Sequence, residues 1–458
     1  MFEFGRELRR WFGGETSPGP FQDGLTGGDG ALLELLELDM LRAEAKAADV
    51  AAGRISAKDR PARQLEAASV WREIARRTGD AAALRKAASH AEQAAAGVGR
   101  ESRPRRWAAA RYEQALAAMT GAALYGDEGL NAAADVALAE AQKAAGPALP
   151  GAMALAARAA IEARKIMTSG DRETCLRAVG RFDAPIRALD GHARRGAVAA
   201  KLIAVGARVD RAELLSACGT RLKDTLLLRM ALDGLTVAGQ DIDPAFEPLT
   251  WARVAIAHGQ ARSALGELDG DVGEISEAVT SLVSVLEHIS RDHSPLDWAQ
   301  AQLALAEALQ MLGEAGDAAR AFDQALSCYD RALMVLADQP ALPLRAAAAH
   351  SRVVCLVRRA EQTCDLESLA EAESSLRVEL TLADPVKDPV AWAVRQLSFA
   401  QICEARAAIT RRDPGSDAAV GMALSAALDV FAEHGLRGLS DTAARGLERL
   451  RVRAEQKS

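Results

Sequence analysis

One short phrase, a proline with a tryptophan three residues later, returns at a nearly constant interval along this chain. The prolines of the series, including two copies without the tryptophan, are Pro104, Pro150, Pro248, Pro295, Pro343 and Pro389. The last four are separated by 47, 48 and 46 residues, and the 98 residues between Pro150 and Pro248 leave room for one unmarked copy near residue 199. A period of this size predicts an array of stacked helical repeats.

The composition of the 458 residues agrees with an all-α fold. Alanine, leucine, glutamate and arginine are abundant, whereas the aromatic residues that favour strands make up only 4%. A formal net charge of −7 argues against a nucleic-acid partner, because binding to phosphates needs a basic face. The six cysteines are dispersed without a Cys-x-x-Cys pair, and we interpret them as reduced core residues of a cytoplasmic protein.

A second mark, glycine followed by aspartate, divides the intervals. It occurs at 79–80, 126–127, 170–171, 270–271 and 316–317. Glycine can end one helix in the left-handed conformation, and aspartate can cap the start of the next. Each interval therefore predicts two helices joined by a tight turn. Because neither helix can bury its apolar face alone, neighbouring hairpins must stack.

The N-terminal 30 residues differ from the repeats. Residues 1–12 predict a short amphipathic helix with one apolar face, made of Phe4, Leu8, Trp11 and Phe12. Residues 13–30 are rich in glycine and proline and predict a flexible linker. The array then has a weakly marked part, 31–240, and a clearer part, 241–458, which we expect to end in a capping helix. No stretch has the ~18–20 apolar residues of a membrane span, and no secretory signal is recognisable.

Residues 294–333 resemble a tetratricopeptide repeat (TPR), and more narrowly a long bacterial variant that begins Pro-Leu-Asp-Trp-Ala. The matching residues are Pro295, Leu296, Asp297, Trp298, Ala299, Gln302, Leu305, Ala306, Ala308, Leu309, Leu312, Gly313 and Glu314. The copies at Pro248, Pro343 and Pro389 match in part. The ordinary unit has ~34 residues, so each copy here carries roughly 13 more, which we expect to lengthen both helices.

The resemblance implies a right-handed α-solenoid of about eight hairpins, whose first helices line a concave groove. The groove positions that it implies are Gln260, Gln300, Leu303, Glu307, Gln310, Arg358, Arg359, Gln401 and Glu404. Most of these side chains are long and polar and suit the binding of a peptide or a helix of another protein. A solvated helix face would carry the same residues without any ligand, so both interpretations stay open.

The recurring tryptophans also have two interpretations. They could form a ligand cage, but a ring at the same place in successive repeats favours a structural core between hairpins. The residues that we assign to this core are Trp107, Trp251, Trp298, Trp392, Leu305, Leu309 and Tyr329.

No set of residues predicts catalysis, a cofactor or a metal site. The loop around His288 and His293 contains competent metal ligands, but their spacing matches no metal signature. Residues 269–274 lack the pattern of a calcium-binding EF-hand. The sequence also lacks the phosphate-binding loop, the nucleophile elbow, the zinc-protease motif and the kinase motifs.

The leading hypothesis is a non-enzymatic, TPR-like scaffold or adaptor of the cytoplasm. It would bind partner proteins in its concave groove and through its N-terminal helix. One alternative is a peripheral assembly factor that residues 1–12 hold weakly at the inner face of a membrane. Another is a small-ligand sensor or an enzyme that uses residues 150–240, where the match to the repeat decays.

Overall fold

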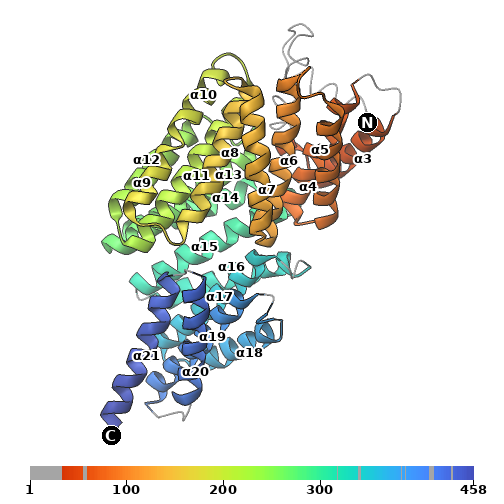
Figure 1. Cartoon of the computed structure of the whole chain (residues 1–458). Coiled ribbons are helices and arrows are strands. Elements are labelled where there is room, and N and C mark those ends of the chain that lie inside the picture. The colour runs from red at the N-terminus through yellow and green to blue at the C-terminus, as the bar shows by residue number, and fades with distance from the viewer. Residues whose placement is uncertain are drawn as a thin grey trace.

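The computed structural model describes residues 33–54, 59–316, 318–338, 342–382, 384–386, 388–411, 417–434 and 437–457. All regular secondary structure in these ranges is helical, and the predicted all-α solenoid is confirmed (Figure 1). The predicted N-terminal helix with Phe4, Leu8, Trp11 and Phe12, and the predicted linker 13–30, lie outside the described residues.

In the described residues, eight consecutive hairpins lie between α3 (Leu38–Gly53) and α21 (Arg437–Lys457). The first helices are α4 (Arg60–Thr78), α6 (Pro104–Tyr125), α8 (Leu149–Met167), α11 (Val198–Leu222), α13 (Pro248–Asp269), α15 (Pro295–Gly316), α17 (Pro343–Thr363) and α19 (Pro389–Thr410). The second helices are α5 (Ala81–Gly97), α7 (Glu128–Ala145), the pair α9 (Arg172–Gly180) and α10 (Asp183–Ala193), α12 (Thr225–Gln240), α14 (Val272–His288), α16 (Ala319–Leu336), α18 (Leu366–Leu382) and α20 (Asp417–Glu433). Each hairpin packs on the next, so the apolar core extends along the array.

The repeating prolines start the first helices. Proline suits the first turn because the backbone N–H that it lacks would have no partner inside the helix. The tryptophan three residues later donates its backbone N–H to the residue before the proline, as from Trp251 to the Glu247 carbonyl oxygen at 2.9 Å. The unmarked repeat predicted near residue 199 is α11, which begins at Val198.

Three of the glycine–aspartate marks form the predicted turn in full. Gly79, Gly126 and Gly270 end their helices with φ angles of 72°, 71° and 70°. The aspartate that follows each of them accepts a hydrogen bond from a backbone N–H in the first turn of the next helix. At 170–171 only the cap forms, since Asp171 accepts from the Thr174 N–H while Gly170 stays outside the left-handed region. In the last mark, residue 317 lies outside the described part of the chain.

Lys223 occupies the left-handed position at the turn between α11 and α12, with a φ of 55°. A lysine pays a steric penalty there that glycine avoids. We therefore expect Lys223→Gly to raise the free energy of unfolding by about 0.5–1 kcal/mol, measured by chemical denaturation. Gly270→Ala, at the equivalent turn, should lower it by a similar amount, and a destabilising Lys223→Gly would contradict the role of this backbone conformation.

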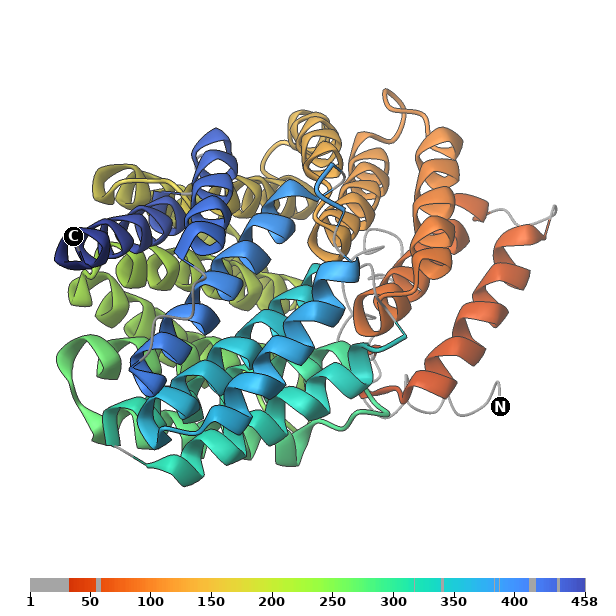
Figure 2. The same ribbon diagram turned by 90° about the horizontal axis from the view of Figure 1, so that it is seen from below.

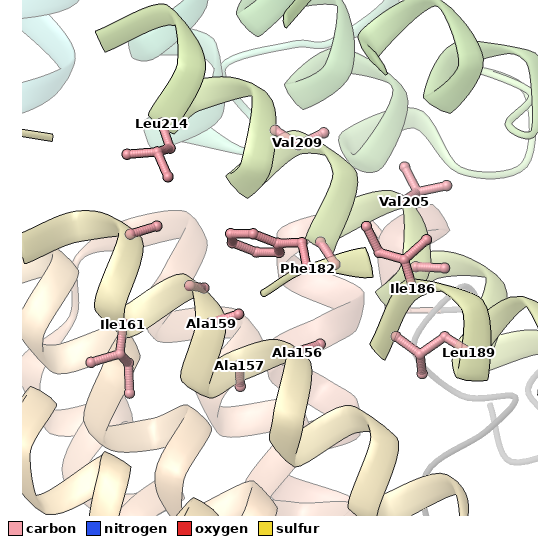
Figure 3. Close-up of a cluster of buried hydrophobic side chains, with 14 of the residues drawn as sticks. Ala156, Ala157, Ala159, Ile161, Phe182, Ile186, Leu189, Val205, Val209 and Leu214 are labelled. Carbon is pink, nitrogen blue, oxygen red and sulfur yellow. The ribbon is translucent and has the colours of Figure 1, made fainter. Parts of the chain in front are cut away.

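The second helix of the third hairpin is broken between α9 and α10. Pro185 lies in the first turn of α10, and its ring would clash with the carbonyl of residue 181 if one helix continued through both. Phe182, at the break, is fully buried. Figure 3 shows its ring between α8, which carries Ala156 and Ala159, and α11. The aromatic ring thus replaces the packing that a continuous helix would supply.

The residues assigned to the core lie in two kinds of environment. Leu305, Leu309 and Tyr329 are buried. Trp251, Trp298 and Trp392 are half-buried and pack against apolar clusters between hairpins.

Trp107 differs from the other repeat tryptophans. The guanidinium groups of Arg100 and Arg111 both lie over its ring, with central carbons 4.9 and 5.7 Å from a ring centroid. Two cations therefore cover this half-buried ring, where the sequence predicts an apolar contact.

The array also winds back on itself, which brings its first hairpins beside hairpins from the middle of the chain (Figure 2). The helix α4 of the first hairpin contacts α15 of the sixth, and α6 of the second contacts α17 of the seventh. Both contacts join hairpins that are five places apart. The superhelix therefore completes a turn in about five hairpins, and successive turns touch.

We call this contact between turns the seam. Glu34, which precedes α3, accepts hydrogen bonds from the backbone N–H groups of Leu249 and Thr250, at 3.1 and 2.9 Å. It thereby caps the N-terminus of α13, a helix more than two hundred residues away in sequence. Burial raises the pKa of Glu34, although its bonds to Thr250 oppose the shift.

Two arginines at the end of α4 form the centre of the seam. Arg76 Nη1 lies 2.9 Å from both carboxylate oxygens of Asp297 at the start of α15. Arg77 is fully buried, and it binds Glu73 at 2.7 Å and the carbonyl oxygens of Leu36 and His293 at 2.8 and 3.4 Å. These two arginines lower the pKa of Glu73 to about 2 against the opposing effect of its burial.

Candidate partner-binding face

We define the inner face as the side of α13, α15, α17 and α19 along which neighbouring first helices contact each other. On α15 its residues follow one another at steps of three or four: Gln300, Leu303, Glu307, Gln310 and Glu314. Residues at this spacing share one side of a helix. The α13 residues 47 places earlier include Gln260 and Glu267, so the long repeat period places matching positions side by side.

Neighbouring first helices contact each other through these side chains. The Gln260 side chain on α13 forms a hydrogen bond with Glu307 on α15. Arg358 on α17 lies 3.8 Å from Glu314 on α15. The Gln310 amide donates to Glu314 at 3.0 Å and accepts a long bond of 3.4 Å from the Tyr329 hydroxyl. The inner face is therefore a continuous polar surface across several hairpins.

Most of the groove residues implied by the TPR resemblance lie on this face, with different exposure. The exposed ones are Gln260, Gln300 and Arg358, the half-buried ones are Glu307, Gln310, Gln401 and Glu404, and Leu303 is buried. Leu303 packs in the cluster that Leu296 and Phe322 share, so it supplies apolar support beneath the polar side chains.

Arg359 does not lie on the inner face. Its side chain bonds to the Ser368 hydroxyl at 2.9 Å and lies 3.1 Å from Asp323, two residues of the second helices α18 and α16. Consecutive residues of a helix point about 100° apart, so Arg358 and Arg359 cannot face the same groove. Glu404 is already paired with Arg449 and Arg453 of α21, at 2.9 and 3.1 Å.

Two carboxyl groups on the inner face of α13 and α15 have raised pKa values. Burial raises the pKa of Glu307, and only the neutral Gln260 side chain opposes the shift by hydrogen bonding. Burial, followed by repulsion from Glu314, raises the pKa of Glu267, which Lys223 partly offsets. A carboxylate with a raised pKa gains stability when a cation approaches it. This part of the face therefore favours a positively charged group.

Glu267 and Glu314 are absent from the groove positions that the resemblance implies. They lie 47 residues apart at equivalent positions, one helical turn beyond the predicted stripe. Extending the stripe from Glu307 by seven residues would have identified Glu314, and the repeat period would then have identified Glu267. The helical spacing and the repeat period that identify these two glutamates were present in the sequence. The groove positions implied by the resemblance ended before them, at Gln310.

The middle of the chain contains a different surface feature. A hollow of about 350 Å³ lies between α10, α11 and α12, lined among others by Ile186, Leu215, Met230 and Val237. Its two arginines are already engaged, Arg208 with Asp190 and Arg211 with Asp183. The hollow offers mainly apolar contact, and the carboxylate of Asp233 on α12 also lines it.

The histidine loop that precedes α15 is occupied by other interactions. The ring of His288 lies 4.7 Å from the Trp251 ring at a tilt of 48°, and the backbone carbonyl oxygen of His293 accepts a hydrogen bond from Arg77. Asp297 is paired with Arg76. Among the described residues, no group of three or more His, Cys, Asp or Glu side chains is placed to hold a metal ion.

Comparison with known proteins finds similarity only in the backbone fold of solved structures. No protein-family model and no curated protein matches the chain. A solved Rap protein in complex with competence and sporulation factor is similar at a TM-score of 0.46 and 11% identity, over 85% of this chain and 98% of that one. The apo form of RapI gives 0.36 and 12%, over 92% and 97%, and a circular tandem repeat protein with a novel repeat topology gives 0.25 and 17%, over 92% and 96%. At these TM-scores the likenesses carry no conclusion about function.

Proposed function

We propose that this protein is a non-enzymatic scaffold that binds a basic, extended segment of a partner protein along its inner face. The observation that carries the proposal is the position of Glu307, a carboxylate between two hairpins whose hydrogen-bond partner is the uncharged Gln260. A lysine or arginine side chain of a bound segment would supply the missing positive charge.

The neighbouring side chains suit the backbone of such a segment. Gln260, Gln300 and Gln401 carry amides that can each donate and accept hydrogen bonds, as a peptide backbone requires. They lie on three of the first helices, α13, α15 and α19, so one extended chain could meet them in order. A scaffold of this kind needs no catalytic group, and its specificity comes from the charge and the spacing of the bound side chains.

Selection from a phage-displayed library of short random peptides tests the proposal. Enriched peptides should carry lysine or arginine, and Glu307→Gln should weaken their binding about tenfold, which corresponds to ~1.4 kcal/mol. The matched control is Glu371→Gln on the outer helix α18, which should leave the affinity unchanged. Enrichment without basic residues, or equal loss in both variants, would contradict the proposed role of the inner face.

The same interaction should depend on pH. Because burial raises the pKa of Glu307, its carboxylate takes up a proton at a higher pH than an exposed glutamate does. We therefore expect the affinity for a selected basic peptide to fall as the pH is lowered from 7 to 5, measured by fluorescence anisotropy. In Glu307→Gln this part of the pH dependence should disappear, and its persistence would assign it to another group.

Two alternatives stay proposals with their own tests. No helix in the described ranges is long and apolar enough to span a bilayer. A peripheral anchor formed by residues 1–12 would be detected if full-length protein floated with anionic vesicles while protein lacking residues 1–30 did not. A small-ligand site in residues 150–240 has the hollow between α10, α11 and α12 as its best location, and a thermal-shift screen with metabolites would detect it.

A further inference from the structure

Two of the six cysteines meet at the third hairpin. Cys175 on α9 and Cys218 on α11 are both fully buried, and their thiols form a hydrogen bond with each other. They are separated by 43 positions in sequence, and each belongs to the apolar cluster that includes Phe182. Both cysteines are free, so the contact is one between two thiols.

An arginine selects which of the two sulfurs carries negative charge. The Arg221 guanidinium donates to the Cys218 sulfur at 3.7 Å and is held in place by the carbonyl oxygens of Met167, at 3.2 Å, and Gly170. The hydrogen bond from Cys175 and the charge of Arg221 lower the pKa of Cys218, although burial opposes the shift. The thiolate is the reactive form of cysteine, so Cys218 is the nucleophile of the pair and Cys175 the proton donor.

The remaining buried cysteines lack these features. Burial raises the pKa of Cys328, and it raises the pKa of Cys355 to about 12. Neither of them is therefore a thiolate at neutral pH, and they serve as internal controls. The pair of Cys175 and Cys218 differs from them through its mutual hydrogen bond and through Arg221, and not through burial alone.

Cys175 and Cys218 are fully buried, so a small reagent reaches them only when α9 moves away from its neighbours. The helix α9 has nine residues and ends at the break before α10, and it packs mainly on α8 and α11. A short, separately terminated helix can move away from its neighbours without unfolding the array, because local openings follow the elements with the fewest contacts. Such an opening exposes Cys175 and Cys218 together.

We propose that Cys218 and Cys175 form a peroxide-sensitive dithiol, which closes to a disulfide between α9 and α11. In the first step the Cys218 thiolate attacks one oxygen of hydrogen peroxide; the O–O bond breaks, Cys218 becomes a sulfenic acid, and hydroxide leaves. In the second step the Cys175 sulfur attacks the Cys218 sulfur, and the Cys175 proton passes to the departing hydroxyl group, which leaves as water. The proton that Cys218 released on ionising neutralises the hydroxide from the first step. Peroxide accepts two electrons, and two waters are formed for each disulfide.

The disulfide changes how the third hairpin moves. In the reduced state α9 can separate from α11, whereas the oxidised protein holds these helices together through a covalent loop of about 43 residues. Closing a loop of this length restricts the unfolded chain, so Tm should rise on oxidation, on the order of 5 °C. Reduction with dithiothreitol should reverse the shift.

Treatment of the full-length protein with hydrogen peroxide, followed by thiol titration and peptide mapping, tests the proposal. Two of the six thiols should be lost, and trypsin should release a disulfide-linked pair of the peptides 173–177 and 212–221. The variant Cys175→Ser should instead accumulate a sulfenic acid at Cys218 that dimedone traps. In Cys218→Ser, dimedone should not label Cys175, since the Arg221 guanidinium donates its hydrogen bond at position 218.

Matched variants separate this chemistry from general damage. Cys328→Ser and Cys355→Ser should still form the linked peptides at the wild-type rate. The proposal is overturned if Cys175 and Cys218 stay reduced at peroxide concentrations that oxidise the exposed Cys364, or if Cys218→Ser is labelled at Cys175 as fast as Cys175→Ser is at Cys218. Peptide binding at the inner face does not depend on these sulfurs. A negative result for peptide binding and a negative result for disulfide formation can therefore be distinguished.

Discussion

Replacing Arg77 with methionine is expected to lower the free energy of unfolding by about 3–5 kcal/mol, the usual effect of removing one partner from a buried ionic group. The Arg77 side chain is 0% exposed and is bound by Glu73 and by backbone carbonyls of Leu36 and His293. Methionine fills a similar volume but donates no hydrogen bond, so those oxygens would be left buried without this donor.

The expected loss is large because three parts of the chain share this one guanidinium. Leu36 belongs to the segment before α3, Glu73 to α4, and His293 to the loop before α15. Urea denaturation of Arg77→Met measures the effect, and Arg42→Met is the control, since Arg42 is exposed on α3 and pairs with the exposed Asp39. The control should change stability by less than about 0.5 kcal/mol. An equally small effect of Arg77→Met would mean that the seam contributes little.

Acidification should destabilise the protein through His350, by ~3 kcal/mol between about pH 6.5 and pH 4. The ring of His350 on α17 packs against α19, with its Nδ1 atom 2.8 Å from the Ser398 hydroxyl. Burial, followed by repulsion from Arg395, lowers the pKa of His350 to about 4. Arg345, Arg395 and Glu379 form an ionic group on the adjoining helices, and its two arginines leave it with a net positive charge.

The sign of this effect follows from the direction of the shift. A histidine with a lowered pKa stays neutral in the folded protein, while the unfolded chain binds a proton below about pH 6.5. As the pH is lowered, the unfolded chain therefore binds a proton at His350 before the folded protein does, and the free energy of unfolding decreases. The decrease ends near pH 4, where His350 of the folded protein is protonated as well. His350→Gln should remove this component, measured as the difference between its stability profile and that of the wild type. His434→Gln, at an exposed histidine after α20, should retain the full pH dependence, and a wild-type profile in His350→Gln would rule out the assignment.

The local structure was largely predictable because its signals are short. Proline at the start of first helices, glycine at their ends and aspartate at the start of second helices each act within one helical turn, so the interval of about 47 residues located α11 without any marker of its own. The helices also carry the extra length that the long period requires, since α13 and α15 have 22 residues each.

The seam was not predictable from these signals. It joins Glu34 to Thr250 and Arg76 to Asp297, residues 216 and 221 positions apart. Whether they meet depends on the pitch of the superhelix, which accumulates from small rotations at each hairpin that no short motif specifies. Asp297 shows the difference clearly, because the resemblance assigns it to a repeat motif while the structure pairs it with a cation from the preceding superhelical turn.

The candidate site was predicted in part for a related reason. The positions of Gln260, Gln300 and Glu307 on one face follow from helical spacing and from the repeat period. The misplacement of Arg359 and the pairing of Glu404 with α21 depend on neighbours outside the hairpin, which the repeat pattern does not describe.

The most direct test of the closed superhelix is a double-mutant cycle on Arg76 and Asp297, whose charged atoms lie 2.9 Å apart. Unfolding free energies of Arg76→Ala, Asp297→Ala and the double variant give the coupling between residues from the first and the sixth hairpin. If successive turns touch, the coupling should be at least about 1 kcal/mol. Substitutions of residues that contact each other within one ion-pair network change the unfolding free energy by amounts that do not add. Additive effects within about 0.5 kcal/mol would show that the two turns stand apart in solution.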